Sequence, residues 1–169
     1  MLKVDLARLE RQRRLRLETE VDPDDPIWAG TGISLARRLD VRLEAQLAGR
    51  DVVVRGRLEG EAALECRRCL KSVRVPIGEE VAVLYQAGLG AAEAEEAEVY
   101  PLPARGTELD LSPMVREQVV LGVPAFAVCS EACRGLCPTC GRNLNEDSCD
   151  CRPTETDERW AALRKQKSD

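Results

Sequence analysis

The most regular pattern in this sequence is an alternation of apolar and polar residues along its middle. Apolar side chains recur at every second position in three stretches, residues 39–47, 52–64 and 73–85. This period is typical of strands that bury one face and expose the other. Residues 49–51 predict a hairpin turn, and Gly56 and Gly60 predict a bulge or a strong twist. We therefore predict an antiparallel β meander or partly closed sheet.

A second pattern, with a period close to 3.6 residues, predicts one helix after the meander. Its shared face comprises Leu111, Val115 and Val119, with Met114 and Leu121 beside them. Asp110 or Ser112 can cap the helix, Pro113 suits its first turn, and Gly122 ends it. Residues 2–6 also alternate and predict a short first strand. We expect the helix to pack on the sheet, which makes the fold class α+β.

Composition limits what this fold can bury and bind. The 169 residues suit one domain with an appendage, and the scarcity of aromatic residues leaves Val, Leu and Ala to supply most of the core.

The net charge of −5 argues against a general nucleic-acid binder, which is usually strongly basic. Glutamates dilute the arginines of residues 8–16, so we interpret that run as a solvated face. Because we find neither a secretory leader nor an apolar run of roughly 20 residues, we expect a soluble cytoplasmic protein.

Cysteine spacing carries the strongest chemical signal. Six of the eight cysteines lie within residues 129–151, and the other two form a CxxC at residues 66–69. A cysteine pair two residues apart, followed by proline or glycine, lets the chain turn so that both sulfurs meet one ion. Residues 137–141, CPTCG, have this form, and the CDC of residues 149–151 completes four ligands.

Eight cysteines and no histidine divide into two sets of four thiolates. The sets are Cys137, Cys140, Cys149 and Cys151, and Cys66, Cys69, Cys129 and Cys133. Four thiolates suit a tetrahedral Zn²⁺ with Zn–S bonds of about 2.3 Å. We therefore predict two structural zinc ions, each held by four cysteines. The second set requires the intervening chain to fold before its two pairs meet.

Other uses of clustered cysteines are less consistent with this sequence. Disulfides persist in oxidising compartments, whereas closely spaced cysteines in a reducing cytosol are more often metal ligands or catalytic thiols. An Fe–S cluster also takes four thiolates, but the spacing differs from the ferredoxin runs. A catalytic zinc keeps one coordination position open for water, and four protein ligands close both sites. We therefore expect a binding protein rather than an enzyme.

The cysteines also divide the chain. We predict a sheet-and-helix core over residues 1–128 and a cysteine-rich, zinc-ribbon-like segment over residues 129–169. This segment ends in a short helix that Asp157 can cap. Residues 87–98 are rich in Gly, Ala and Glu and lack apolar periodicity, so we predict an acidic loop and assign it no function.

Four motifs occur here in one combination. They are Cys66-Arg-Arg-Cys69-Leu70, Leu109-Asp110-Leu111 before a helix with Glu117, the run from Cys133 through Asn143 and Asn145 to Cys151, and residues 157–163. Together they resemble the YceD family, the large ribosomal RNA subunit accumulation proteins, over most of the chain from about residue 40 on. The resemblance implies a role in the synthesis, processing or stability of 23S ribosomal RNA, with no catalytic residues to transfer. Some relatives keep a His/Cys pair at the places of Cys129 and Cys133, which supports the division of ligands.

The resemblance and the cysteines together predict a non-enzymatic ribosome-biogenesis factor. Zinc would hold basic side chains against ribosomal RNA or a large-subunit ribosomal protein or precursor, with no membrane and no small-molecule substrate involved. The candidate side chains are Arg67, Arg68, Lys71, Arg74, Arg134 and Arg142. An equally open interpretation is that the charges around the CxxC only offset the −2 charge of a Zn(Cys)₄ site.

Two other functions stay open at this point. A zinc-ribbon chaperone or delivery factor for one ribosomal protein needs no RNA contact, and nothing in the sequence separates it from an RNA binder. A thiol oxidoreductase needs one CxxC of low pKa, which a bound zinc would mask. A nuclease would need clustered carboxylates or histidines, and the chain has no histidine.

Overall fold

The computed structural model describes residues 2–90, 93, 99–103 and 106–151. Its elements are β1 (Lys3–Asp5), α1 (Leu6–Gln12), β2 (Arg14–Val21), the 3₁₀ turn η1 (Pro26–Trp28), β3 (Ser34–Leu35), β4 (Leu39–Ala48), β5 (Asp51–Glu65), β6 (Ser72–Ala87), β7 (Tyr100–Leu102), β8 (Glu108–Asp110) and α3 (Ser112–Gly122). The α+β class is confirmed. The predicted terminal helix and most of the predicted acidic loop lie outside the described residues.

The main sheet has the strand order β2-β4-β5-β6-β7, with β3 also paired to β5. Its pairs are antiparallel except β6–β7, and β1 and β8 form a separate two-stranded sheet. The alternation therefore predicted the three central strands and their meander order correctly. The β5–β6 register runs through Gly56 and Gly60 without interruption, and the β4–β5 register runs through Gly56, so neither glycine forms a bulge.

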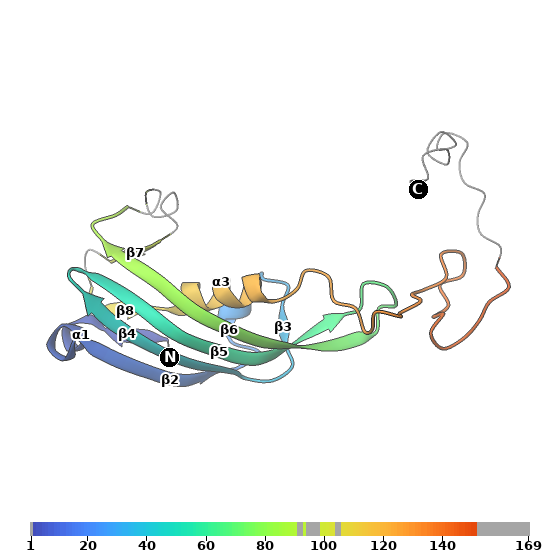
Figure 1. Ribbon diagram of the computed structural model, residues 1–169, viewed down its shortest axis with the longest axis horizontal. Coiled ribbons are helices and arrows are strands. Elements are labelled where there is room, and N and C mark those ends of the chain that lie inside the picture. Colours follow the sequence, from blue (N-terminus) through green and yellow to red (C-terminus); the bar gives the residue numbers. More distant parts are fainter. Residues whose placement is uncertain (1, 91–92, 94–98, 104–105, 152–169) are drawn as a thin grey trace, which may run out of the picture.

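One face of this sheet is buried beneath α3 (Figure 1). The buried side chains of the central strands include Leu39, Val41, Leu43, Val52, Val54, Leu58, Ile77 and Val81. Met114, Val115 and Val119 of α3 complete the core, as their helical spacing predicts. Leu121 is 72% exposed, contrary to our prediction, because it lies about 200° around the helix from Val119.

Polar contacts fix the position of α3 beside η1. The guanidinium of Arg116 donates hydrogen bonds to the carbonyl oxygens of Ile27 and Ala29, at 2.8 and 2.7 Å. The neighbouring Trp28 is buried in the core, and its Nε1–H donates to the Asp22 carbonyl at 2.9 Å. Trp28 is therefore a packing residue. Helix α3 is held on the sheet by its apolar face and by the hydrogen bonds from Arg116 to the carbonyls beside Trp28.

The opposite face of the sheet pairs its charges across neighbouring strands. Ion pairs link Arg16 to Glu44 at 3.2 Å, Arg42 to Glu59 at 3.5 Å, and Arg57 to Glu80 at 3.2 Å. These side chains are largely solvated, so each pair contributes only about 0–1 kcal/mol to stability. The arginines of residues 8–16 lie in α1, at its C-terminal cap and in β2, and all are exposed, as we interpreted them.

The β5–β6 hairpin extends past the end of α3 toward the cysteine-rich segment (Figure 1). Its register stays paired up to Glu65 and Ser72, directly before and after the turn that contains Cys66 and Cys69. A long, regular hairpin therefore positions the first cysteine pair at one end of the sheet.

Of the described glycines, Gly56 leaves the least room for a side chain. Its φ is +154°, and a Cβ there would overlap the Arg42 carbonyl oxygen and lie 2.8 Å from the Leu43 Cα. We predict that Gly56→Ala lowers the free energy of unfolding by about 3 kcal/mol or more, because the β4 backbone must move. Urea unfolding followed by circular dichroism measures this change.

Gly78→Ala is the matched control. Gly78 lies in β6, where an added Cβ would meet only the Arg57 guanidinium at 4.0 Å. We expect its unfolding free energy to stay within about 1 kcal/mol of the native protein. Equal losses of unfolding free energy in the two variants would show that the close approach of β4 and β5 at Gly56 does not cause the destabilisation.

Candidate metal centres

The first group of four cysteines joins the end of the sheet to the chain that follows α3. Cys66 and Cys69 occupy the turn between β5 and β6, whereas Cys129 and Cys133 lie downstream of the helix. The Sγ atoms of Cys66 and Cys133 are 3.8 Å apart, and those of Cys69 and Cys129 are 3.7 Å apart. All four sulfurs lie within 4.8 Å of one another.

These sulfur separations fit a shared metal ion. Bonds of about 2.3 Å to a central tetrahedral zinc place two sulfurs about 3.8 Å apart, whereas a disulfide brings them to about 2.05 Å. A donor set of four soft sulfurs, without oxygen or nitrogen, suits Zn²⁺ and disfavours Mg²⁺ or Ca²⁺. The residues of the first group therefore fit the predicted Zn(Cys)₄ site in number, chemistry and spacing.

Hydrogen bonds within the CxxC turn aim its sulfurs inward. The Leu70 N–H donates to the Cys66 carbonyl, and the Cys66 N–H donates to the Lys71 carbonyl, both at 2.8 Å. Leu70 has a φ of +59°, a left-handed conformation that costs a non-glycine residue on the order of 1 kcal/mol. Across the site, the Cys129 N–H donates to the Cys66 Sγ at 3.4 Å.

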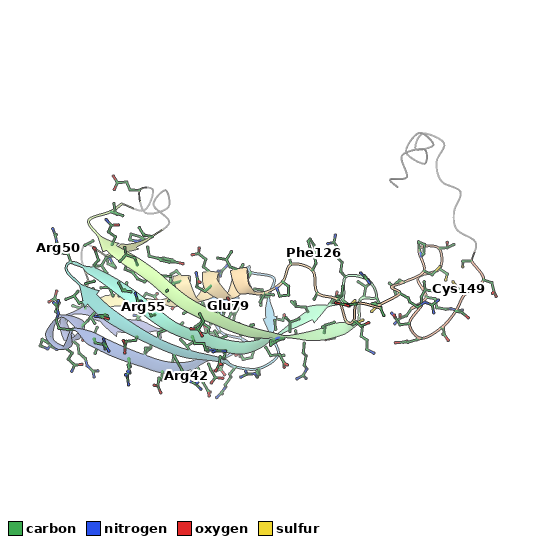
Figure 2. All side chains as sticks on the ribbon, in the orientation of Figure 1. Arg42, Arg50, Arg55, Glu79, Phe126 and Cys149 are labelled. Atoms are coloured by element: carbon green, nitrogen blue, oxygen red, sulfur yellow. The ribbon has the colours of Figure 1, made fainter. Side chains whose placement is uncertain are left out.

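The second group lies farther along the cysteine-rich segment, where Figure 2 labels Cys149. The sulfurs of Cys137, Cys140, Cys149 and Cys151 also lie within 4.8 Å of one another. The turn closes through a hydrogen bond from the Gly141 N–H to the Cys137 carbonyl at 2.9 Å. Gly141 has a φ of +73°, so glycine adopts this turn without the penalty of a side chain. Two groups of four cysteines therefore lie close enough to hold metal ions.

Electrostatics within each group oppose full ionisation of the four thiols. The Cys129 N–H lowers the pKa of the Cys66 thiol to about 6, and the Cys140 N–H does the same for Cys137. Hydrogen bonding to Cys133 raises the pKa of Cys129 to about 12, and bonding to Cys140 raises that of Cys151 to about 12. A divalent cation offsets the repulsion among four thiolates, so metal binding releases protons and weakens as the pH falls.

Arg68 ties the CxxC turn to the loop that carries Cys133. Its guanidinium donates hydrogen bonds to the carbonyl oxygens of Glu131 and Cys133, at 2.9 and 3.1 Å. Its own carbonyl accepts from the Leu136 N–H at 3.0 Å. Arg68 is also a candidate for RNA or partner contact, and its guanidinium here holds the loop that carries Cys133.

Asn145 connects the two cysteine groups. It lies between Cys140 and Cys149, yet its Nδ2 donates to the Cys133 Sγ at 3.4 Å, and its Oδ1 accepts from the Arg134 N–H at 2.8 Å. Partners of this kind orient metal ligands and stabilise thiolate charge. The loop of the second group is therefore docked against a ligand of the first.

Sequence reasoning did not find this role of Asn145. The signal was present in the pair Asn143 and Asn145, because asparagine side chains favour turns that bond the backbone two residues on. The structure shows this turn, in which the Asn145 N–H donates to the Asn143 Oδ1 at 3.1 Å. Spacing alone does not reveal that the same side chain reaches the first group.

The other basic candidates have different surroundings. The Arg67 guanidinium lies 3.8 Å from the centre of the exposed Phe126 ring, and Arg142 donates to the Ser148 carbonyl at 2.7 Å. Arg74 pairs with Glu61 at 3.3 Å, while Lys71 and Arg134 are exposed. Lys71 forms no ion pair within the described part of the chain.

Comparison with known families gives one match that spans most of the chain. The family described as "Large ribosomal RNA subunit accumulation protein YceD" matches residues 54–167, a region that includes both cysteine groups. No solved structure gave a significant match. None of the helices in the described residues has the length and apolar character that crossing a bilayer requires.

Individual relatives match to different extents. An uncharacterized protein of Mycobacterium tuberculosis is 30% identical over 165 residues, which cover 95% of this chain and 78% of that protein. The chloroplastic YCED homolog 1 of Arabidopsis thaliana is 39% identical over 61 residues, and that of Zea mays is 46% identical over 52 residues. These two matches cover 36% and 30% of this chain but only 19% and 18% of the plant proteins.

We predict that the purified protein binds two zinc ions per chain and that each group binds its ion separately. Cys69→Ser and Cys140→Ser should each reduce the content to one ion, because three thiolates hold zinc less well than four. Elemental analysis and native mass spectrometry measure the stoichiometry. Thr139→Ala, in the same turn as Cys140, is the control and should keep two ions; a native protein without zinc would refute both sites.

Arg68 yields a second prediction. Arg68→Gln removes the hydrogen bonds to the Glu131 and Cys133 carbonyls, so we expect zinc affinity at the first group to fall about 10-fold or more. Competition with a chromogenic chelator measures this change. Arg67→Gln removes the same charge one residue away without touching that loop, and its affinity should stay close to native. Equal losses would mean that charge alone, and not the hydrogen bonds, supports the site.

Proposed function

This chain belongs to the YceD family of large ribosomal RNA subunit accumulation proteins, and from that premise we propose that it is a non-enzymatic ribosome-biogenesis factor. It acts in the cytoplasm, where it supports the synthesis, processing or stability of 23S ribosomal RNA. Its direct partner is ribosomal RNA within a large-subunit precursor. The ribosome-related role follows from the family, and the partner and the mechanism are our inference.

The observation that carries this proposal is the first cysteine group. It takes two ligands from the β5–β6 turn and two from chain at least 60 residues downstream, so one ion would fix both segments at the same end of the sheet. Four protein ligands leave no coordination position for a water or a substrate, which is typical of structural rather than catalytic zinc. Zinc at this site would supply rigidity to the surface around it.

The surface around this group is locally basic although the chain is acidic overall. Arg67, Arg68, Lys71 and Arg74 lie within eight residues of one another, against a net charge of −5 for the whole chain. All four are exposed, but Arg68 is engaged in holding the Cys133 loop and Arg67 covers the Phe126 ring. We propose that Lys71 and Arg74 contact phosphates, since rigidly held cations lose less freedom on binding.

We predict that removing the gene lowers large-subunit ribosomal RNA relative to small-subunit RNA and that the native chain restores the ratio. Cys66→Ser should fail to restore it, because the first group then loses its fourth ligand and the downstream segment comes free. Quantification of both RNAs from total RNA measures the outcome. Thr139→Ala, which spares every ligand and should keep both ions, should restore the ratio as the native chain does.

A second measurement separates RNA from protein as the partner. The tagged chain should co-sediment with large-subunit precursors, and RNase treatment should release it. Association that survives RNase would favour delivery of one ribosomal protein instead, and a normal RNA ratio in cells without the gene would refute the biogenesis role.

A further inference from the structure

A polar cleft with a volume of about 530 Å³ lies beside the first cysteine group. Cys69 and Cys129 form part of its wall, so it borders two of the proposed metal ligands. The remaining lining is mostly polar and includes Lys71, Ser72, Arg74, Ser130, Asn143 and Asn145. Neither the family description nor the proposed zinc sites assigns a ligand to this space.

Three segments that are distant in sequence build the cleft. One wall is the start of β6, a second is the chain around Cys129, and the third is the loop of residues 143–146. Backbone hydrogen bonds hold the third wall in place, from the Leu136 N–H to the Arg68 carbonyl at 3.0 Å and from the Leu144 N–H to the Gly135 carbonyl at 2.9 Å. Asn145 adds its contacts to Arg134 and Cys133. The cleft therefore depends on both cysteine-rich loops being folded.

The lining chemistry identifies the class of ligand. Pockets for small organic ligands are predominantly apolar with a few polar groups, whereas Val73 is the only aliphatic residue among the described residues that line this cleft. Lysine, arginine, serine and asparagine side chains are the groups that contact phosphates and sugars in protein–nucleic acid complexes. The volume falls within the range of about 300–1,000 Å³ that holds a ligand of nucleotide size. These features favour a sugar–phosphate unit.

The charges around the cleft permit an anion despite the neighbouring thiolates. A zinc ion with four thiolates carries a net charge of −2, which Arg67 and Arg68 offset at the adjacent turn. Arg74 pairs with Glu61, but both side chains reach solvent, so the pair is weak and a phosphate can replace the carboxylate. Lys71 adds a further cation, and Glu146 is the acidic residue in the lining that opposes an anion.

We propose that this cleft binds the sugar–phosphate backbone of single-stranded RNA, with Lys71 and Arg74 on the phosphates and Ser130 and Asn143 near the sugars. The inference rests on the proposed function and names the surface that carries it. It also gives the second cysteine group a role, since that group holds the loop that forms one wall. Most lining residues are exposed, which leaves room for a chain to enter and leave.

The test measures binding of a fluorescein-labelled, 12-nucleotide single-stranded RNA to the zinc-loaded full chain at several salt concentrations. Lys71→Gln and Arg74→Gln should each weaken binding about 5-fold or more at low salt and reduce the salt slope by about 0.7, the value for one phosphate contact on a single strand. Glu146→Gln should tighten binding about 2-fold, because it removes the opposing carboxylate. Lys71→Arg keeps the charge and should bind nearly as well as the native chain.

The matched controls are Arg50→Gln and Arg55→Gln, at the end of the sheet remote from the cysteines (Figure 2). Each removes one positive charge from the chain, so both should leave affinity and salt slope close to native if the cleft is the binding site. Every variant is first checked for two zinc ions and an unchanged unfolding midpoint. Equal weakening by the cleft and control variants would overturn the proposal in favour of a general charge effect.

Further outcomes separate the possible ligands. Unlabelled AMP that displaces the RNA at equal nucleotide concentration would overturn the proposal in favour of a free nucleotide. RNase-resistant association with precursors that still requires Lys71 and Arg74 would overturn it in favour of an acidic protein segment. If the Lys71→Gln and Arg74→Gln chains bind RNA normally, the cleft is not the RNA-binding site. That result would leave the biogenesis role intact when these chains also restore ribosomal RNA in cells. A native chain that binds the RNA but does not restore ribosomal RNA would refute the proposed function instead.

Discussion

The first cysteine group is the interaction on which the arrangement of this chain depends. It connects the end of the longest hairpin to a segment that begins 60 residues later, and the described chain around it has little other apolar packing. Val73 and Leu136 are the partly buried apolar residues packed against these cysteines. Thiolate–metal bonds would therefore replace the hydrophobic core that a short extension of this kind cannot build.

The sheet is packed in a different way. Its buried face, α3 and Trp28 form one continuous apolar cluster that contains none of the cysteines. The structure thus combines a region stabilised by aliphatic packing with a region organised around sulfur. Whether these regions unfold separately, with a boundary near residue 128, stays a prediction, because Cys129 and Cys133 belong to the segment beyond that boundary and lie beside Cys66 and Cys69.

The sequence predicted the parts of this structure that follow from periodicity or from donor chemistry. The strands 39–48, 51–65 and 72–87 were predictable because burial of one face imposes a period of two on the apolar residues. Helix α3 was predictable because its apolar residues recur every three or four positions. The cysteines lie in the two predicted groups of four. Strand β2 was not identified, since its alternating Leu15 and Leu17 stand among arginines and glutamates. The contacts of Arg68 and Asn145 were not predictable either, because ligand spacing does not determine which loops touch.

The ion pairs on the open face of the sheet have a consequence for the way this molecule meets a polyanion. Arg16, Arg42 and Arg57 are each neutralised by a glutamate on a neighbouring strand, so that face presents little excess charge. With a net charge of −5, the chain as a whole is repelled by RNA at long range. Any attraction for RNA therefore comes from cations outside this face, and at physiological salt it acts only within about 8 Å.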